Sequence, residues 1–271
     1  MRARRAVVVG DPLQIEPVVT LPLSLVEKVC QSFGVDAEEW AAPKASAQTL
    51  ADSGSLYQGW IERSDGAVRI GAPLLVHRRC EQPMFGISNT ISYARLMVRA
   101  TRDRSSRIRD VLGPSRWLHL EGFSDGKWCP QEGEVALDLV AQLVRAGIAD
   151  PDVFLIAPFR AVAYGLRDRF RSEADVLARI TSAPQKWLYD RIGTVHTVQG
   201  KEAEAVIFVL GATNAQQTGA RSWAGSPPNL VNVAVSRAKQ ALYVIGNRNI
   251  WHAHGSFQTL AERMDFQDLS R

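Results

Sequence analysis

The stretch from Gly193 to Glu202 reads Gly-Thr-Val-His-Thr-Val-Gln-Gly-Lys-Glu, and the apolar run Ala-Val-Ile-Phe-Val-Leu follows it at residues 205–210. A run of this kind predicts a strand that is buried on both faces of a sheet. Similar short apolar runs predict strands at residues 6–9, 117–120, 153–157, 192–196 and 241–245. Helical patterns alternate with them at residues 134–146, 161–171 and 232–239. The order predicts an α/β fold whose parallel sheet carries helices on both faces.

Composition narrows the class of protein. The 271 residues are 46% hydrophobic, and no apolar run approaches the length of a membrane-spanning helix. The three cysteines, Cys30, Cys80 and Cys129, are far apart and show no metal-binding spacing. Such sparse cysteines suit a reducing compartment, so we expect a cytoplasmic protein. A net charge of +4 and a pI near 9.1 permit contact with nucleic acid without requiring it.

Three stretches interrupt the α/β pattern. Residues 41–55 are rich in Ala and Ser and predict an irregular connector, and residues 216–228 predict a loop. Residues 99–109 contain five arginines. The favoured interpretation is a solvated loop, and the alternative is an arm that contacts phosphates. A boundary near Gly71 would divide a small front segment from the main domain.

The first of four chemical motifs is Gly10-Asp-Pro-Leu-Gln-Ile-Glu-Pro17, directly after the predicted strand 6–9. The turn after a parallel strand is where ligand sites form in α/β sheets. The second motif contains His77, Arg78 and Arg79. The planar, permanently charged fork of an arginine suits the charge on a transferring phosphoryl group, although such a pair can also be an ordinary surface feature.

The third motif is the stretch quoted at the outset. Gly200 would let the backbone approach a ligand without a clashing side chain. Thr194, His196 and Thr197 offer hydroxyl, imidazole or backbone donors to phosphates. A histidine in such a place is more often structural, and nothing in the stretch supports a metal site.

The fourth motif is Asn232-Val-Ala-Val-Ser-Arg-Ala-Lys239. On a helix, Asn232, Ser236 and Lys239 fall on one side, with Arg237 beside them. Taken alone, these eight residues could form an ordinary basic helix.

Together and in this order, the four motifs resemble motifs III, IV, V and VI of superfamily 1 helicases. The resemblance covers almost the whole chain and is closest to the branch that contains the nonsense-mediated-decay helicases and their bacterial relatives. It implies a RecA-like fold of the P-loop NTPase type. It also implies ATP with Mg²⁺ as cofactor and single-stranded DNA or RNA as partner.

The resemblance assigns roles to matching residues. Gln14, Arg78 and Arg237 take the catalytic positions, with Arg79 as an adjacent alternative to Arg78 and Arg237 as the arginine finger. The nucleotide-binding positions are Gly10, Asp11, Gln14, Arg78, Gly200, Glu202 and Arg237. The nucleic-acid-binding positions are Pro158, Phe159, Thr194, His196 and Thr197. Phe159 could stack on a base, or it could pack a helix onto the sheet.

The chain departs from the family in one respect. A phosphate-binding loop reads Gly-x-x-x-x-Gly-Lys-[Ser/Thr], but the Gly-Lys pairs here, at residues 126–127 and 200–201, precede Trp128 and Glu202. No apolar strand ends in Asp-Glu to hold magnesium. We therefore expect residues 1–70 to be the end of a first RecA-like lobe and residues 71–271 to be a second lobe. Such a chain should bind ATP poorly and hydrolyse it negligibly without the missing lobe.

Three accounts of such a motor half remain open. The chain could be part of a full-length helicase, a separately encoded half that pairs with a Walker-containing partner, or a non-catalytic nucleic-acid-binding remnant. A small α/β enzyme with its own chemistry has little support, since there is no Gly-x-Ser-x-Gly turn and His252 and His254 lack acidic or Cys partners. In isolation, residues 7–9 and 18–26 should expose apolar surface and limit solubility.

Overall fold

The computed structural model describes residues 6–11, 13–14, 19–41, 45–62, 66–226 and 228–270, without the side chains of Glu38 and Val68. The chain divides into two compact units, Met1–Leu75 and Val76–Arg271. The origin that the sequence suggests for the first unit, the end of a RecA-like lobe, stays a prediction.

The first unit contains three helices and a strand pair. The helices are α1 (Leu23–Ser32), α2 (Ala37–Trp40) and α3 (Ala47–Ser53), and β1 (Gly59–Ile61) pairs antiparallel with β2 (Val68–Ile70). A capping box between Ser46 and Thr49 begins α3, so the prediction of an irregular connector over residues 41–55 was wrong for the helical part. Buried Asp52 accepts a hydrogen bond from the amide of Gly71 at 3.1 Å, which fastens α3 to the end of β2.

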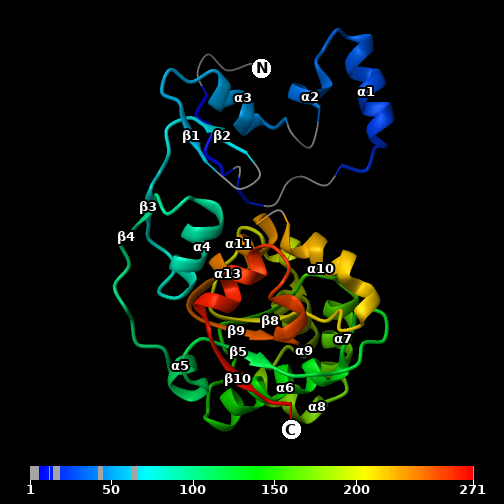
Figure 1. Cartoon of the computed structure of the whole chain (residues 1–271). Helices are drawn as coiled ribbons and strands as arrows, with labels where there is room; N and C mark the ends of the chain where they lie inside the picture. The colour runs from blue at the N-terminus through cyan, green and yellow to red at the C-terminus, as the bar shows by residue number, and fades with distance from the viewer. Residues whose placement is uncertain are drawn as a thin grey trace. The chain divides into compact units, whose positions relative to one another are not determined.

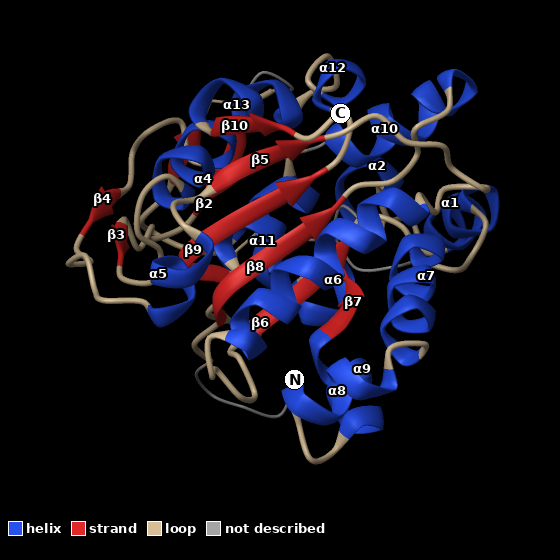
Figure 2. Cartoon of the chain, turned by 90° about the horizontal axis from the view of Figure 1, so that it is seen from below, coloured by secondary structure: helices blue, strands red, loops and turns tan. Residues whose placement is uncertain are grey.

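The second unit is built on a six-stranded parallel sheet with the order β10-β5-β9-β8-β6-β7 (Figure 2). Its strands are β5 (Arg116–His119), β6 (Val153–Ala157), β7 (Ile192–Thr194), β8 (Ala203–Val209), β9 (Ala238–Ile245) and β10 (Asp265–Asp268). Every residue of β6 is buried, as are nearly all those of β8 and β9, which matches their continuous apolar sequence.

Helices cover both faces of this sheet, so the predicted fold class is confirmed. Figure 2 shows α6 (Pro130–Arg145) in front of the sheet and α11 (Asn229–Ser236) behind it. Helix α6 packs on α7 (Arg160–Arg171), whereas α11 packs on α4 (Met84–Ser92). Gly147, directly after the C-cap of α6, has φ +75°, a conformation that suits glycine.

Shorter elements complete the second unit. They are β3 (Val76–His77) parallel to β4 (Val98–Arg99), α5 (Arg107–Leu112), α8 (Ala174–Ile180), α9 (Pro184–Arg191), η1 (Val195–Val198), η2 (Ala215–Gln217), α10 (Thr218–Gly225), α12 (Arg248–Trp251) and α13 (Ser256–Arg263). The colours of Figure 1, from blue at the N-terminus to red at the C-terminus, give the chain order of these elements.

Several sequence predictions were wrong. Residues 6–9 form no strand, and Val7 and Val9 are exposed because no described strand pairs with them. The predicted loop 216–228 contains α10, and β10 was not predicted. The predicted helix 232–239 ends at Ser236, since β9 begins at Ala238 and pairs with the start of β8. Sheet pairing thus outweighs the local helical pattern.

Candidate functional site

Residues of the second, third and fourth motifs meet at one place in the second unit. Arg79 follows β3, and its Nε lies 2.7 Å from Glu202 Oε2, just before β8. Arg79 Nη1 lies 3.5 Å from the carbonyl oxygen of Ser236. Arg237 Nη1 donates to the carbonyl of Lys201 at 2.8 Å. The three motifs therefore form one cluster of two arginines and a glutamate.

The backbone explains why these side chains meet. Ala203 of β8 is paired with Ala238 of β9, and the Ala203 amide donates to the Arg237 carbonyl at 3.0 Å. Glu202 and Arg237 therefore occupy the residues directly before two neighbouring strands. The Glu81 amide donates to the carbonyl of Lys239 at 2.8 Å, which holds the Arg79 segment against the same edge.

Arg237 is enclosed in this arrangement, with 1% of its surface exposed. Its Nε donates to the Val233 carbonyl and its Nη2 to Ser236 Oγ, both at 3.2 Å. Burial lowers the pKa of the guanidinium, and the positive charge of Arg79 lowers it further. Because so little of the Arg237 surface is exposed, a ligand could reach the guanidinium only after the groups that cover it move.

Of the two adjacent arginines in the second motif, Arg79 makes the contact with the third motif. Arg78, which the resemblance aligned with motif IV, is exposed, and Arg79 is half-buried. His77 accepts a hydrogen bond from the Cys80 amide at 2.8 Å and packs its ring 5.3 Å from that of Phe85. These contacts hold the backbone on both sides of Arg79, whose side chain reaches Glu202. We therefore carry Arg79 forward as the motif IV candidate.

The first motif lies in the other unit and forms a turn of its own. Asp11 Oδ1 accepts from the Leu13 amide at 3.0 Å, and Gln14 Nε2 donates to Asp11 Oδ2 at 3.2 Å. Gly10 directly precedes this turn, and Pro17 lies outside the described residues. The Gln14 amide is thus held by Asp11, the residue with which the motif begins its turn.

The third motif runs from the carboxyl ends of the parallel strands back to their amino ends. Thr194 ends β7, level with the end of β6, whereas Glu202 precedes the start of β8. Since β8 has 7 residues, these two ends are roughly 20 Å apart. Gly200 has φ +82°, and a Cβ there would meet no atom of the described residues within 4 Å. Glycine is needed at this position for backbone conformation, and the space beside it is open.

The predicted nucleic-acid-binding residues gather at the carboxyl edge. Thr197 Oγ1 donates to the Thr194 carbonyl at 2.8 Å. His196 is exposed, and burial of part of its ring lowers its pKa, with the charge of Arg160 lowering it further. Pro158 and Phe159 follow β6 at this edge and are both buried.

Phe159 lies inside an aromatic cluster that the sequence did not reveal. Its ring centroid is 5.9 Å from that of Trp223 and 6.3 Å from that of Trp251, and Lys127 Nζ lies 4.6 Å from the ring. Phe159 is only 6% exposed, whereas Trp223 is 54% exposed. The one sequence feature that could have indicated this cluster was the presence of a tryptophan, Trp223, in the stretch 216–228 that was predicted to be a loop.

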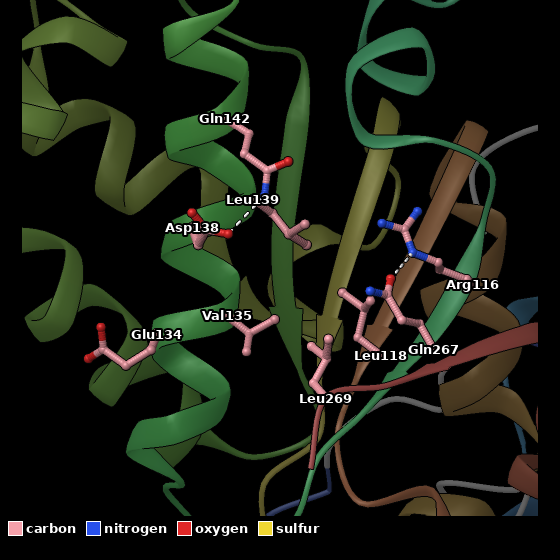
Figure 3. Close-up of a pocket in the computed structure, with 9 residues that line it drawn as sticks. All are labelled: Arg116, Leu118, Glu134, Val135, Asp138, Leu139, Gln142, Gln267 and Leu269. Atoms are coloured by element: carbon pink, nitrogen blue, oxygen red, sulfur yellow. Dashed lines mark hydrogen bonds between the residues drawn. The ribbon is translucent and has the colours of Figure 1, made fainter. Parts of the chain in front are cut away.

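A cavity of about 310 Å³ lies elsewhere, between β5, α6 and β10 (Figure 3). Figure 3 shows Arg116 and Gln267 on one side and Glu134, Asp138 and Gln142 on the other. Arg116 donates to Gln267 at 3.0 Å, and Gln142 donates to Asp138 at 2.8 Å. Its polar groups already bond one another and none belongs to the four motifs, so we do not assign the functional site to this cavity.

Among the described residues, no group of three or more His, Cys, Asp or Glu side chains could hold a metal ion. No helix in the described part of the chain has the length and apolar character needed to cross a membrane.

The chain is similar to a family model, to a curated relative and to a solved structure. The model of the AAA_12 family, described as an AAA domain, matches residues 92–249. The chain is 27% identical over 128 residues to the DNA polymerase alpha-associated DNA helicase A of Schizosaccharomyces pombe, an alignment that covers 47% of this chain and 17% of that helicase. The C-terminal domain of a possible DNA helicase from Lactobacillus plantarum WCFS1 aligns with 14% identity and a TM-score of 0.41, covering 70% of this chain and 98% of that domain. The chain thus spans less than a fifth of the Schizosaccharomyces pombe relative.

Proposed function

The chain belongs to the AAA_12 family of AAA domains and is of the superfamily 1 helicase C-terminal type, and we propose that it is the motor half that supplies arginines to ATP bound on a partner lobe. In this proposal, hydrolysis drives unwinding of, or translocation along, single-stranded DNA or RNA. The observation that carries the proposal is the cluster of Arg79, Glu202 and Arg237, which unites three motifs that are far apart in sequence.

The chemistry of the cluster suits the terminal phosphates of ATP. Phosphoryl transfer spreads negative charge over equatorial oxygens, and arginine guanidinium groups stabilise that charge. Glu202 now neutralises Arg79, so a triphosphate would compete with the carboxylate for the same guanidinium. Arg237 would serve as the arginine finger once its fork leaves the Lys201 carbonyl. Glu202, once released, would accept hydrogen bonds from the nucleotide.

We assign the other half of the ATP site, which holds the phosphates and Mg²⁺, to a different lobe. From the resemblance of their motif, Gly10, Asp11 and Gln14 are proposed to bind the nucleotide, with Gln14 contacting its terminal phosphate. Bound Mg²⁺ would neutralise phosphate charge, and its ligands would come from the lobe that carries the Walker motifs, in the same or a separate chain. The printed sequence contains neither of those motifs.

We assign nucleic-acid binding to the carboxyl ends of the strands, at the opposite end of the sheet from the cluster of Arg79, Glu202 and Arg237. Thr194, His196 and Thr197 would donate to backbone phosphates, because two of the three are exposed and all lie in one short segment. The same segment continues to Glu202, which belongs to the proposed nucleotide site at the amino ends of the strands. Movement of residues 195–202 would therefore connect the two sites.

The first test is to measure oligonucleotide binding and ATP turnover with the purified chain. We expect binding of single-stranded DNA or RNA that weakens as salt is raised, because backbone phosphates release counterions. We expect negligible turnover without an added lobe. Failure to bind either nucleic acid at low salt would contradict the nucleic-acid part of the proposal. Turnover by the chain alone would contradict the division of the ATP site.

The remaining alternatives make different predictions. A separately encoded or full-length motor predicts that a lobe with the Walker motifs restores turnover. A non-catalytic nucleic-acid-binding remnant predicts salt-sensitive binding that no added lobe converts into hydrolysis.

A further inference from the structure

Three aromatic rings form a row that leads from the core to the surface. Trp251 is fully buried, Phe159 is almost buried, and Trp223 is half-exposed. The ring centroids of Trp251 and Phe159 are 6.3 Å apart, and those of Phe159 and Trp223 are 5.9 Å apart. The two inner rings support the outer one, whose remaining surface faces solvent.

The exposed ring sits on an anchored helix. Arg221 of α10 is buried, and its Nη1 donates to the carbonyls of Ala212 at 2.7 Å and Asn214 at 2.9 Å. A Cβ on Gly225 would lie 2.2 Å from the His254 carbonyl oxygen, so the end of α10 is tightly packed. Trp223 is therefore held outward by a fixed backbone, which is the arrangement that a stacking surface needs.

Positive charge borders the row. Lys127 Nζ lies 4.6 Å from the centroid of the Phe159 ring. Arg160, the residue after Phe159, is exposed and acts electrostatically on His196. An exposed aromatic ring whose supporting ring has cations beside it matches single-stranded nucleic acid, in which bases stack on aromatic side chains and phosphates contact basic groups.

We propose that Trp223 stacks on a base of a bound single strand, while Lys127 and Arg160 contact its phosphates. The inference rests on the proposed nucleic-acid binding and adds a residue outside the helicase motifs. It gives Phe159 the role of a supporting ring beneath Trp223, because Phe159 presents almost no surface of its own.

The test measures binding of a fluorescein-labelled single-stranded oligonucleotide by anisotropy. Trp223→Ala should weaken binding by about 5- to 150-fold, the range found for loss of one base–aromatic stack, and Trp223→Phe should retain most of the affinity. Phe266→Ala is the matched control, because Phe266 is 55% exposed, about as much as Trp223, and lies on β10 with Arg248 over its ring. This control should leave affinity unchanged.

An abasic oligonucleotide separates stacking from a general loss of fold. The wild-type chain should bind it more weakly than the normal strand, and Trp223→Ala should bind both strands equally. Circular dichroism monitors the fold of the variant. If Trp223→Ala does not fold, the decisive readout is quenching of tryptophan fluorescence by the normal strand, which should be largely lost in Trp223→Phe.

The outcomes distinguish the two proposals. If the wild-type chain binds no single strand, the proposed nucleic-acid function fails. If the wild-type chain binds and Trp223→Ala binds equally well with the same preference for bases, the stacking proposal alone is overturned. Unchanged quenching in Trp223→Phe would also overturn it. Self-association that Trp223→Ala abolishes, without a change in oligonucleotide affinity, would instead identify a contact between copies of this chain.

Discussion

Arg79 and Glu202 form an ion pair in which Arg79 Nε lies 2.7 Å from the Glu202 carboxylate, beside the carbonyl of Ser236. The pair is partly exposed, so it adds only about 0–1 kcal/mol to stability. Its main consequence is that Arg79, from the second motif, lies against Glu202 of the third motif and Ser236 of the fourth.

The first prediction concerns the adjacent arginines. In the motor assembled with its first lobe, Arg79→Ala should lower ATP turnover by on the order of 10³-fold, because an arginine directed at the phosphates would be lost. Arg78→Ala is the control and should lower turnover less than about tenfold, since Arg78 is exposed. Steady-state turnover with saturating single strand measures both. A larger loss for Arg78→Ala would restore Arg78 as the motif IV arginine.

The second prediction concerns the stability of the Arg237 pocket. Arg237→Ala leaves the Lys201 carbonyl and Ser236 Oγ without this donor, and should lower the free energy of unfolding by about 1–3 kcal/mol. Arg237→Lys should recover only part of that loss, because an ammonium cannot reproduce the planar fork. Urea unfolding followed by circular dichroism gives the values. Equal stability of Arg237→Ala and the wild-type chain would show that the enclosed guanidinium contributes nothing.

The third prediction concerns Glu132, which is fully buried in α6. Its Oε2 accepts from the Gly211 amide at 2.7 Å, and its Oε1 has no hydrogen-bond partner among the described residues. Burial raises the pKa of this carboxyl from 4.5 to about 8. At pH values between these two pKa values, the Glu132 carboxyl is protonated in the folded state and ionised in the unfolded state. Stability should fall as pH rises through this window, by about 1.4 kcal/mol per unit of pKa difference at most.

Glu132→Gln provides the measurement, because its amide cannot ionise. The variant should lack this fall and should exceed the wild-type free energy of unfolding at pH 8. Glu134→Gln is the control on the same helix: Glu134 is exposed, and its pKa is lowered by Arg169, so the fall should remain. Parallel pH profiles for Glu132→Gln and the wild-type chain would be inconsistent with a buried, protonated Glu132.

The fourth prediction concerns the apolar surface of the first unit. Val7 is 91% exposed and Val9 is 81% exposed, and α1 buries none of its residues. The purified chain should bind a hydrophobic dye and self-associate, and Val7→Ser combined with Val9→Ser should reduce both effects. Analytical ultracentrifugation and dye fluorescence report the outcome. A sharp monomer boundary without dye binding would contradict the prediction.

Much of the fold followed from apolar periodicity. The runs at 153–157 and 205–210 predict buried strands, and both lie in the centre of the sheet, where burial on two faces leaves an unmistakable pattern. The edge strand β10 is exposed along its length and mixes Asp and Gln with Phe266, so it carries no such pattern. Residues 238 and 239 were predicted to end a helix, because the local sequence does not show that they pair with β8.

The candidate site was only partly predictable for a similar reason. The motifs selected Glu202 and Arg237 and aligned Arg78 with motif IV, whereas Arg79, the alternative, is the arginine that contacts Glu202. Which of two adjacent side chains reaches a distant segment depends on the tertiary fold. The exposed face of Trp223 depends on the packing of α10 through Arg221, a contact between segments that sequence patterns do not encode.

The central claim is that this chain completes an ATP site whose phosphate-binding loop lies on another lobe. The most direct measurement is ATP turnover, stimulated by a single strand, for the chain mixed with a lobe that carries the Walker motifs, beside the same mixture containing Arg237→Ala. We predict turnover only in the wild-type mixture, with a loss on the order of 10³–10⁵-fold in the variant. Turnover by the chain alone, or turnover in the mixture that Arg237→Ala leaves unchanged, would contradict the account.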